Sequence, residues 1–211
     1  MEVVRSTSID DVFINCPFDR EYQKLFDALL FTVLACGFRP RSAKEVADDS
    51  ELRLNKIYAL IEECRFGIHD ISRTELDDVN NLPRFNMPFE LGIFLGAKKF
   101  GNKAQKEKRA LIFDYEAYCY IKFMSDIAGA DIHIHQNDPF KIVAETRDWL
   151  ANVSKRNLPS AQNIQNLYEG FEAKLPVTAA ELGFNPQKIP YSDFLKMITA
   201  SLIYPVPTAG D

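Results

Sequence analysis

Residues 12–37, VFINCPFDREYQKLFDALLFTVLACG, join a short apolar run, a polar turn and a longer amphipathic stretch. The run Val12-Phe13-Ile14 is typical of a buried strand. After the turn, apolar residues recur three and four positions apart, which is typical of a helix with one buried face: Tyr22, Leu25, Phe26, Leu29, Leu30 and Val33. Gly37 stands where a C-terminal glycine ends a helix. The stretch therefore predicts a strand followed by a helix that packs back onto it.

The same alternation of strand and helix signals continues to residue 153. Short strand-like runs recur at residues 38–42, 66–72, 110–114 and 130–135, and helical periodicity falls between them. Strands separated by helices indicate parallel pairing with right-handed crossovers. We predict an α/β fold for residues 1–153, with an open parallel sheet of about five strands and flanking helices.

Residues 154–211 follow a different pattern, in which the signals are helical only. A polar linker at 154–160 precedes two apolar stripes, which are Ile164, Leu167, Tyr168, Phe171 and Leu175, then Tyr191, Phe194, Leu195, Ile198 and Leu202. Between them, Thr178 and Glu181 have the spacing of a capping box, which predicts a separate short helix. We predict a C-terminal helical extension that packs on the α/β domain or on another subunit, with residues 205–211 as a tail.

Composition excludes several classes of protein. The chain has 211 residues and a net charge of -5, and 46% of its residues are hydrophobic and 12% aromatic, which disfavours disorder and a broad nucleic-acid or membrane surface. Its four cysteines form no CxxC pair, and it shows neither a signal peptide nor an 18-residue apolar run. We expect a cytoplasmic protein with reduced thiols.

Asp131, His133 and His135 alternate, but no fourth ligand is evident nearby, so we expect a polar strand face and no metal.

Two acids stand where chemistry is expected. Parallel α/β sheets bind ligands beyond the carboxyl ends of their strands, which places functional residues just after Ile14, Ile68 and Phe113. Asp70 falls at such an end, and Glu90 falls in the first turn of an apolar helix, near its positive end. A carboxylate in apolar surroundings needs a partner or a task. The alternatives are that Glu90 caps its helix or pairs with Arg84, and that Asp70 is a turn residue.

The turn after the first strand is a second candidate. Asn15, Pro17 and Phe18 place polar groups and a ring at its tip, where backbone N–H groups and Asn15 could meet a phosphate or ribose. The turn contains neither a GxGxxG fingerprint nor a P-loop, so an ordinary βα turn is the alternative. Without an identifiable Cys–His–Asn arrangement, Cys16 is expected to be a packed thiol.

Three segments together resemble one superfamily. The segments VFINCPF (12–18), IHDIS (68–72) and NMPFELG (86–92) are similar to those of the superfamily that joins nucleoside 2-deoxyribosyltransferases to bacterial TIR-like domains, over roughly residues 10–150. Asp70 matches a strand-end aspartate of the transferases, and Phe89-Glu90-Leu91-Gly92 matches their acid-bearing helix start. The chain departs from the transferases at 84–88, where their aspartate and glycine are replaced by RFNMP, and from TIR domains at Asn15-Cys16-Pro17, where they carry a serine.

The resemblance implies a flavodoxin- or TIR-like sheet and the cleavage or transfer of an N-glycosidic bond. The substrate would be NAD, a nucleoside or a nucleotide, with no other cofactor. A carboxylate beneath C1′ can stabilise an oxocarbenium-like centre or attack it, and a second acid can bind ribose hydroxyls or manage a proton. We expect Glu90 in the first role and Asp70 in the second, with substrate contacts from Asn15, Pro17, Phe18, Arg84, Asn86 and Phe89.

Bacterial members often act in anti-phage defence, which suggests a defence-system partner. The two apolar stripes of residues 154–211 suggest a homo-oligomer, and packing within the chain is the alternative. The alternative function is a non-catalytic nucleotide-binding or signalling module on the same fold.

Overall fold

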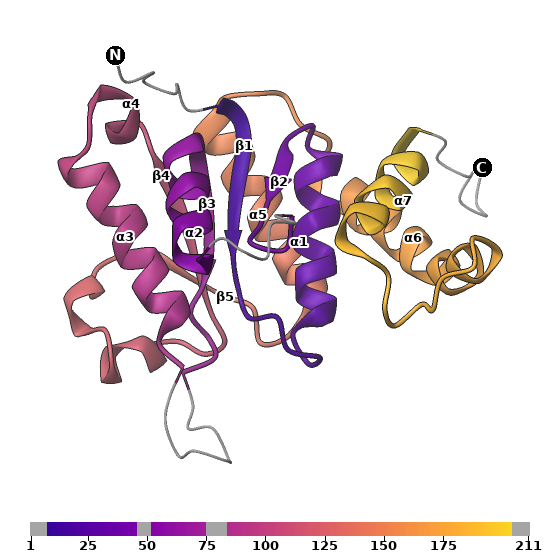
Figure 1. Ribbon diagram of the computed structural model, residues 1–211, viewed down its shortest axis with the longest axis horizontal. Coiled ribbons are helices and arrows are strands. Elements are labelled where there is room, and N and C mark those ends of the chain that lie inside the picture. Colours follow the sequence, from indigo (N-terminus) through magenta and orange to yellow (C-terminus); the bar gives the residue numbers. More distant parts are fainter. Residues whose placement is uncertain (1–7, 46–51, 75–83, 204–211) are drawn as a thin grey trace.

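The computed structural model describes residues 8–45, 52–74 and 84–203, and its centre is a parallel sheet. Five strands pair in the order β2-β1-β3-β4-β5, all in parallel, and their bounds are β1 Ser8–Asn15, β2 Arg39–Arg41, β3 Cys64–Asp70, β4 Arg109–Asp114 and β5 Ile132–Ile134 (Figure 1). The predicted α/β fold with an open parallel sheet is therefore confirmed. This strand order is one of the two common doubly wound arrangements, with a switch point beside β1.

Helices cover both faces of the sheet, and their bounds are α1 Gln23–Ala35, α2 Arg53–Glu63, α3 Asn86–Phe100, α4 Lys103–Lys106 and α5 Pro139–Ser154. Two short 3-10 turns, η1 Cys119–Lys122 and η2 Ser125–Ile127, lie between β4 and β5. Because side chains alternate along a strand, Val12 and Ile14 pack with α1 and α5, whereas Phe13 packs with α2 and α3. Both faces of β1 are thus buried, as its apolar run predicted.

Residues next to α1 in the sequence determine where this helix begins and ends. It starts at Gln23, and Asp19 accepts a hydrogen bond from the Tyr22 N–H at 2.9 Å in the turn before it, so Asp19 orders the turn rather than the helix itself. Gly37 follows the helix with a φ of +74°, the left-handed conformation that favours glycine. The predicted glycine stop is therefore confirmed.

Two further helices, α6 Ala161–Glu181 and α7 Tyr191–Ile203, form the C-terminal extension. The short helix predicted from Thr178 and Glu181 is wrong, because both residues lie in the last turn of α6. Ser160 caps α6 by accepting from the Asn163 N–H at 3.2 Å, and the buried stripe continues to Ala179. Packing thus carries the helix past Pro176. The expected tail at 205–211 lies outside the described residues.

The extension packs against the α/β layer. Tyr168, Phe171 and Ile198 belong to the same buried cluster as Val12 and Phe31. Figure 1 shows α6 and α7 beyond α1, on the opposite side of the molecule from α3.

Across the described ranges, no helix combines the length and the apolar character that a membrane crossing requires. None of the four cysteines, all of which are described, forms a disulfide, and Cys119 is the one that is not buried.

Candidate functional site

The carboxyl ends of three neighbouring strands place polar side chains along one edge of the sheet. β1 ends at Asn15, β3 at Asp70 and β4 at Asp114, and Asn15 pairs with His69 while Asp70 pairs with Phe113 in the strand register. All three side chains are buried, with exposed fractions of 2%, 0% and 2%. Residues just after Ile14, Ile68 and Phe113 thus share one buried edge.

Asp70 is held by several groups from its own chain. The Tyr22 hydroxyl donates to its Oδ2 at 2.7 Å, and the backbone N–H and hydroxyl of Ser72 donate to its Oδ1 at 2.9 and 2.5 Å. Hydrogen bonds to a carboxylate stabilise its charged form and fix its orientation. Asp70 is therefore both a turn residue, as one alternative had it, and the centre of a buried network.

His135 completes that network. Its Nδ1 accepts from the Asn137 N–H at 2.9 Å, so Nε2 is the ring nitrogen that carries a proton. Nε2 lies 3.1 Å from Asp70 Oδ2, although out of line for a hydrogen bond. His133, by contrast, contacts Glu145 at 2.7 Å and is partly exposed. The two histidines therefore do not act as one polar face.

Asp114 has spare bonding capacity. Its Oδ1 accepts from the Tyr115 N–H at 2.7 Å, whereas no described residue makes a hydrogen bond to its Oδ2. Burial, opposed by the Tyr115 bond, raises the pKa of Asp114 to about 6. Within the described part of the chain, no group of three or more His, Cys, Asp or Glu residues is arranged to hold a metal ion.

Glu90 lies one residue past the first turn of α3, slightly deeper than predicted. The Asn15 side chain donates from Nδ2 to the Met87 carbonyl at 3.0 Å, which ties the start of α3 to the end of β1. Glu90 is only 4% exposed, and its Oε1 is 4.0 Å from Nη2 of Arg53. Burial raises the pKa of Glu90 to about 7, and Arg53 opposes that rise. The carboxyl is thus poised to change charge near neutral pH.

Cys16 lies within electrostatic reach of both acids. Burial raises the pKa of its thiol well above the ordinary value, and the negative charges of Asp70 and Glu90 raise it further. A thiol in this setting stays protonated, as expected of a packed cysteine.

The proposed substrate contacts divide into a buried and an exposed group. Asn15 is buried, and its Nδ2 also lies 3.1 Å from His69 Nδ1, while its Oδ1 has no partner among the described residues. Pro17 is buried and Phe18 half-buried, with Nζ of Lys44 4.7 Å from the Phe18 ring centroid. The exposed group lies around the start of α3 and consists of Arg84, Asn86 and Phe89.

Sequence reasoning missed three members of the edge. Tyr22 was assigned to the apolar stripe of α1, yet its hydroxyl bonds Asp70. His135 was assigned to a strand face, yet it lies beyond β5 and beside Asp70. Asp114 carried a usable signal, because it directly follows Phe113 at a predicted strand end.

A larger cavity lies away from these acids. It has a volume of about 550 Å³ and is lined by α6, α7, the loop between them and Phe31 of α1, and by none of the candidate site residues. The buried carboxyls of Glu90 and Asp114, whose pKa values burial raises, belong to the sheet edge and not to this cavity.

Comparisons with protein-family models, with curated proteins and with solved structures found no match to this chain.

Proposed function

We propose that the protein cleaves or transfers the N-glycosidic bond of NAD or of a nucleoside or nucleotide, with Glu90 at the reaction centre. The observation that carries the proposal is the Glu90 carboxyl, which is 4% exposed and whose pKa burial raises to about 7, in a helix that Asn15 at the end of β1 bonds through the Met87 carbonyl. The resemblance to nucleoside 2-deoxyribosyltransferases and TIR-like domains agrees with that position.

The chemistry needs a negative charge close to C1′. When the bond between ribose and base breaks, positive charge develops at C1′, and a desolvated carboxylate stabilises it far better than a hydrated one does. Burial prepares Glu90 for this role, and developing positive charge favours its ionised form. Attack of the same carboxylate on C1′ would give a covalent route to transfer instead of hydrolysis.

Asp70 supplies the second acid of the proposal. Its carboxyl is fully buried and already bonded to Tyr22 and Ser72, so a ribose hydroxyl reaches it by displacing the Ser72 hydroxyl. The Nε2 of His135 lies 3.1 Å from Oδ2 and lines the same side of this carboxyl. The proposed substrate contacts are the ones named from the sequence, and Asn15 Oδ1 is an acceptor without a partner among the described residues.

A non-catalytic nucleotide-binding or signalling module is the second candidate. The observation that favours it is that groups of the chain itself already bond both Asp70 oxygens, Ser72 twice at Oδ1 and Tyr22 once at Oδ2. A cytoplasmic location, a role in antiviral defence and assembly into a homo-oligomer are further proposals that follow from the sequence and the resemblance.

The test compares the wild-type protein with Glu90→Gln and with Asp27→Asn as a matched control. Asp27 is also a carboxyl whose pKa burial raises to about 6, but it lies on α1 and bonds Gln23. Each protein is incubated with NAD and a panel of nucleosides, and released bases are separated by chromatography. We expect release by wild type and Asp27→Asn, and a loss of about a hundredfold or more in Glu90→Gln.

The two candidate functions give different results in this assay. Unchanged activity in Glu90→Gln would overturn the proposed catalytic role. If the wild type releases no base while a nucleotide raises its melting temperature, the binding module is favoured.

A further inference from the structure

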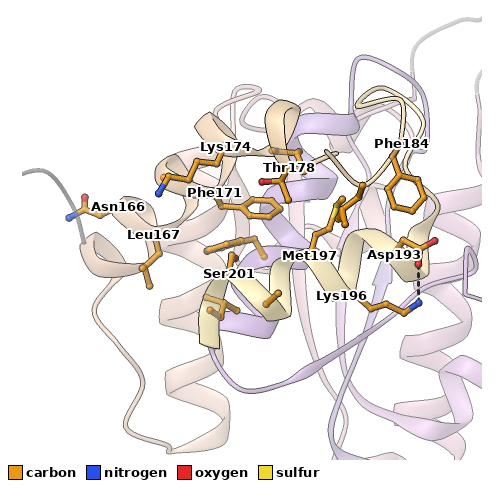
Figure 2. Close-up of a pocket in the computed structure, with 16 residues that line it drawn as sticks. Asn166, Leu167, Phe171, Lys174, Thr178, Phe184, Asp193, Lys196, Met197 and Ser201 are labelled. Carbon is orange, nitrogen blue, oxygen red and sulfur yellow. Dashed lines mark hydrogen bonds and ion pairs between the residues drawn. The ribbon is translucent and has the colours of Figure 1, made fainter. Parts of the chain in front are cut away.

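The two C-terminal helices enclose an apolar groove that the proposed function does not use. The groove has a volume of about 550 Å³, within the roughly 300–1,000 Å³ typical of small-molecule sites. Its walls include Phe171 of α6 and Met197 of α7 (Figure 2). Leu175 of α6 and Phe31 of α1, the latter from the α/β layer, also line it. An apolar space of this size is expected to favour an apolar ligand body.

Gly170 of helix α6 leaves open space in the groove, although glycine destabilises a helix. Gly170 lies in the middle of α6 and lines the groove, although glycine is a poor residue for a helix interior. A Cβ atom built on Gly170 meets nothing within 4 Å, so packing within the described chain does not require glycine there. The open space beside Gly170 is therefore available to a ligand.

The charges of the groove are distributed unevenly along its length. Figure 2 shows Lys174 extending toward the end marked by Asn166 and Leu167, while Asp193 and Lys196 lie at the opposite end near Phe184. Asp193 and Lys196 form an ion pair at 2.9 Å, so their charges compensate each other. Lys174 has no ion-pair or hydrogen-bond partner among the residues that the structure describes. One end of the groove therefore offers an uncompensated positive charge.

We propose that this groove binds a small amphipathic anion, an alkyl chain that ends in a carboxylate. The chain lies over Phe171 and Met197 in the space beside Gly170, and the carboxylate faces Lys174. Apolar burial supplies most of the affinity, and the lysine sets the orientation and the preference for an anion. This site is independent of the chemistry at Glu90.

The size of the groove favours a small molecule over a second protein chain. A stable protein interface buries roughly 800 Å² on each partner, and the exposed lining of this groove is much smaller. A single alkyl chain matches the apolar lining, and its terminal carboxylate matches the positive charge of Lys174.

The test uses dodecanoate below its micelle concentration, with dodecyltrimethylammonium and acetate as matched probes of the chain and the head group. Isothermal titration calorimetry and melting temperatures are recorded for the full chain. We expect dodecanoate to bind saturably and raise the melting temperature, and the other two probes to bind more weakly. Equal binding of the cationic and anionic amphiphiles, or no binding of dodecanoate, would overturn the proposal.

Two variants test the geometry. Gly170→Leu places a side chain in the groove while favouring the helix, so the protein should fold and lose dodecanoate binding. Gly96→Leu is its control, because Gly96 also lies inside a helix with nothing near an added Cβ, but in α3. Lys174→Gln should weaken binding about two- to fivefold, as expected for an exposed ion pair, whereas Lys103→Gln on α4 should not.

The binding and light-scattering results distinguish a small ligand from a second copy of the chain as the occupant of the groove. Undiminished binding in Gly170→Leu, with circular dichroism showing an intact fold, would overturn the proposed position of the ligand. If light scattering shows a wild-type dimer that Gly170→Leu dissociates, the groove is an interface between copies of the chain, and the small-molecule proposal fails.

Discussion

The carboxyl edge of the sheet and the groove between α6 and α7 are built on opposite principles. At the edge, Asn15, Asp70 and Glu90 are almost fully buried. In the groove, the buried residues are apolar, and the charged residues Lys174 and Lys196 stay at the exposed rim. The edge therefore keeps polar groups away from water, whereas the groove keeps apolar groups together and leaves its charges hydrated.

The two regions therefore differ in the free energy that burial of their polar groups costs. Burying a carboxyl destabilises a fold unless bonds compensate, and Asp70 is compensated by Tyr22 and Ser72, whereas the ion pair of Glu90 with Arg53 is long, at 4.0 Å. Buried carboxyls with raised pKa values are typical of sites that use charge in a reaction. The groove contains no comparable buried carboxyl among its lining residues, and its design suits binding without chemistry.

The largest predicted effect comes from removing the best compensated acid. Asp70→Ala leaves the Tyr22 hydroxyl and the His135 ring buried without their carboxylate. We expect the free energy of unfolding to fall by about 3–5 kcal/mol, as measured by urea denaturation. Asp193→Ala, the matched change at the groove, breaks an exposed ion pair and should cost less than about 1 kcal/mol. Equal losses in the two variants would remove the contrast between the regions.

A smaller effect of opposite sign is predicted for Glu90→Gln. Burial raises the pKa of Glu90 in the folded protein to about 7, so between its ordinary value and about 7 the folded state holds more protons than the unfolded state. Stability from this group therefore falls as pH rises through that range. Glutamine does not ionise, so the variant should be about 3 kcal/mol more stable than wild type at pH 8.

The same comparison at pH 4.5 is the control for this effect. Both proteins then hold an uncharged side chain at position 90, and their unfolding free energies should nearly coincide. A difference that stays constant from pH 4.5 to pH 8 would show that Glu90 is not held neutral by burial.

The fold was predictable because each burial pattern is visible in the sequence. A strand buried on both faces, β1, reads as a continuous apolar run, and a helix buried on one face, α1, reads as a single apolar stripe. The positions of Asn15 and Asp70 followed from the rule that places ligands beyond strand ends. Tyr22 was not predictable as a partner of Asp70, since its spacing matches the apolar stripe and only the tertiary fold brings its hydroxyl to that acid. The groove was equally hidden, because an apolar stripe does not reveal whether another element covers it.

The smallest predicted effect concerns the groove itself. Gly170 lies inside α6 with open space around a Cβ, so Gly170→Ala should stabilise the protein by about 0.5–1 kcal/mol through helix propensity alone. Gly37→Ala is the matched control of opposite sign, because its φ of +74° strains any side chain, and it should cost about 1 kcal/mol. Chemical denaturation of both variants measures the pair. A loss of stability in Gly170→Ala would mean that the glycine serves packing within the chain, and the space beside it would then no longer count as room for a ligand.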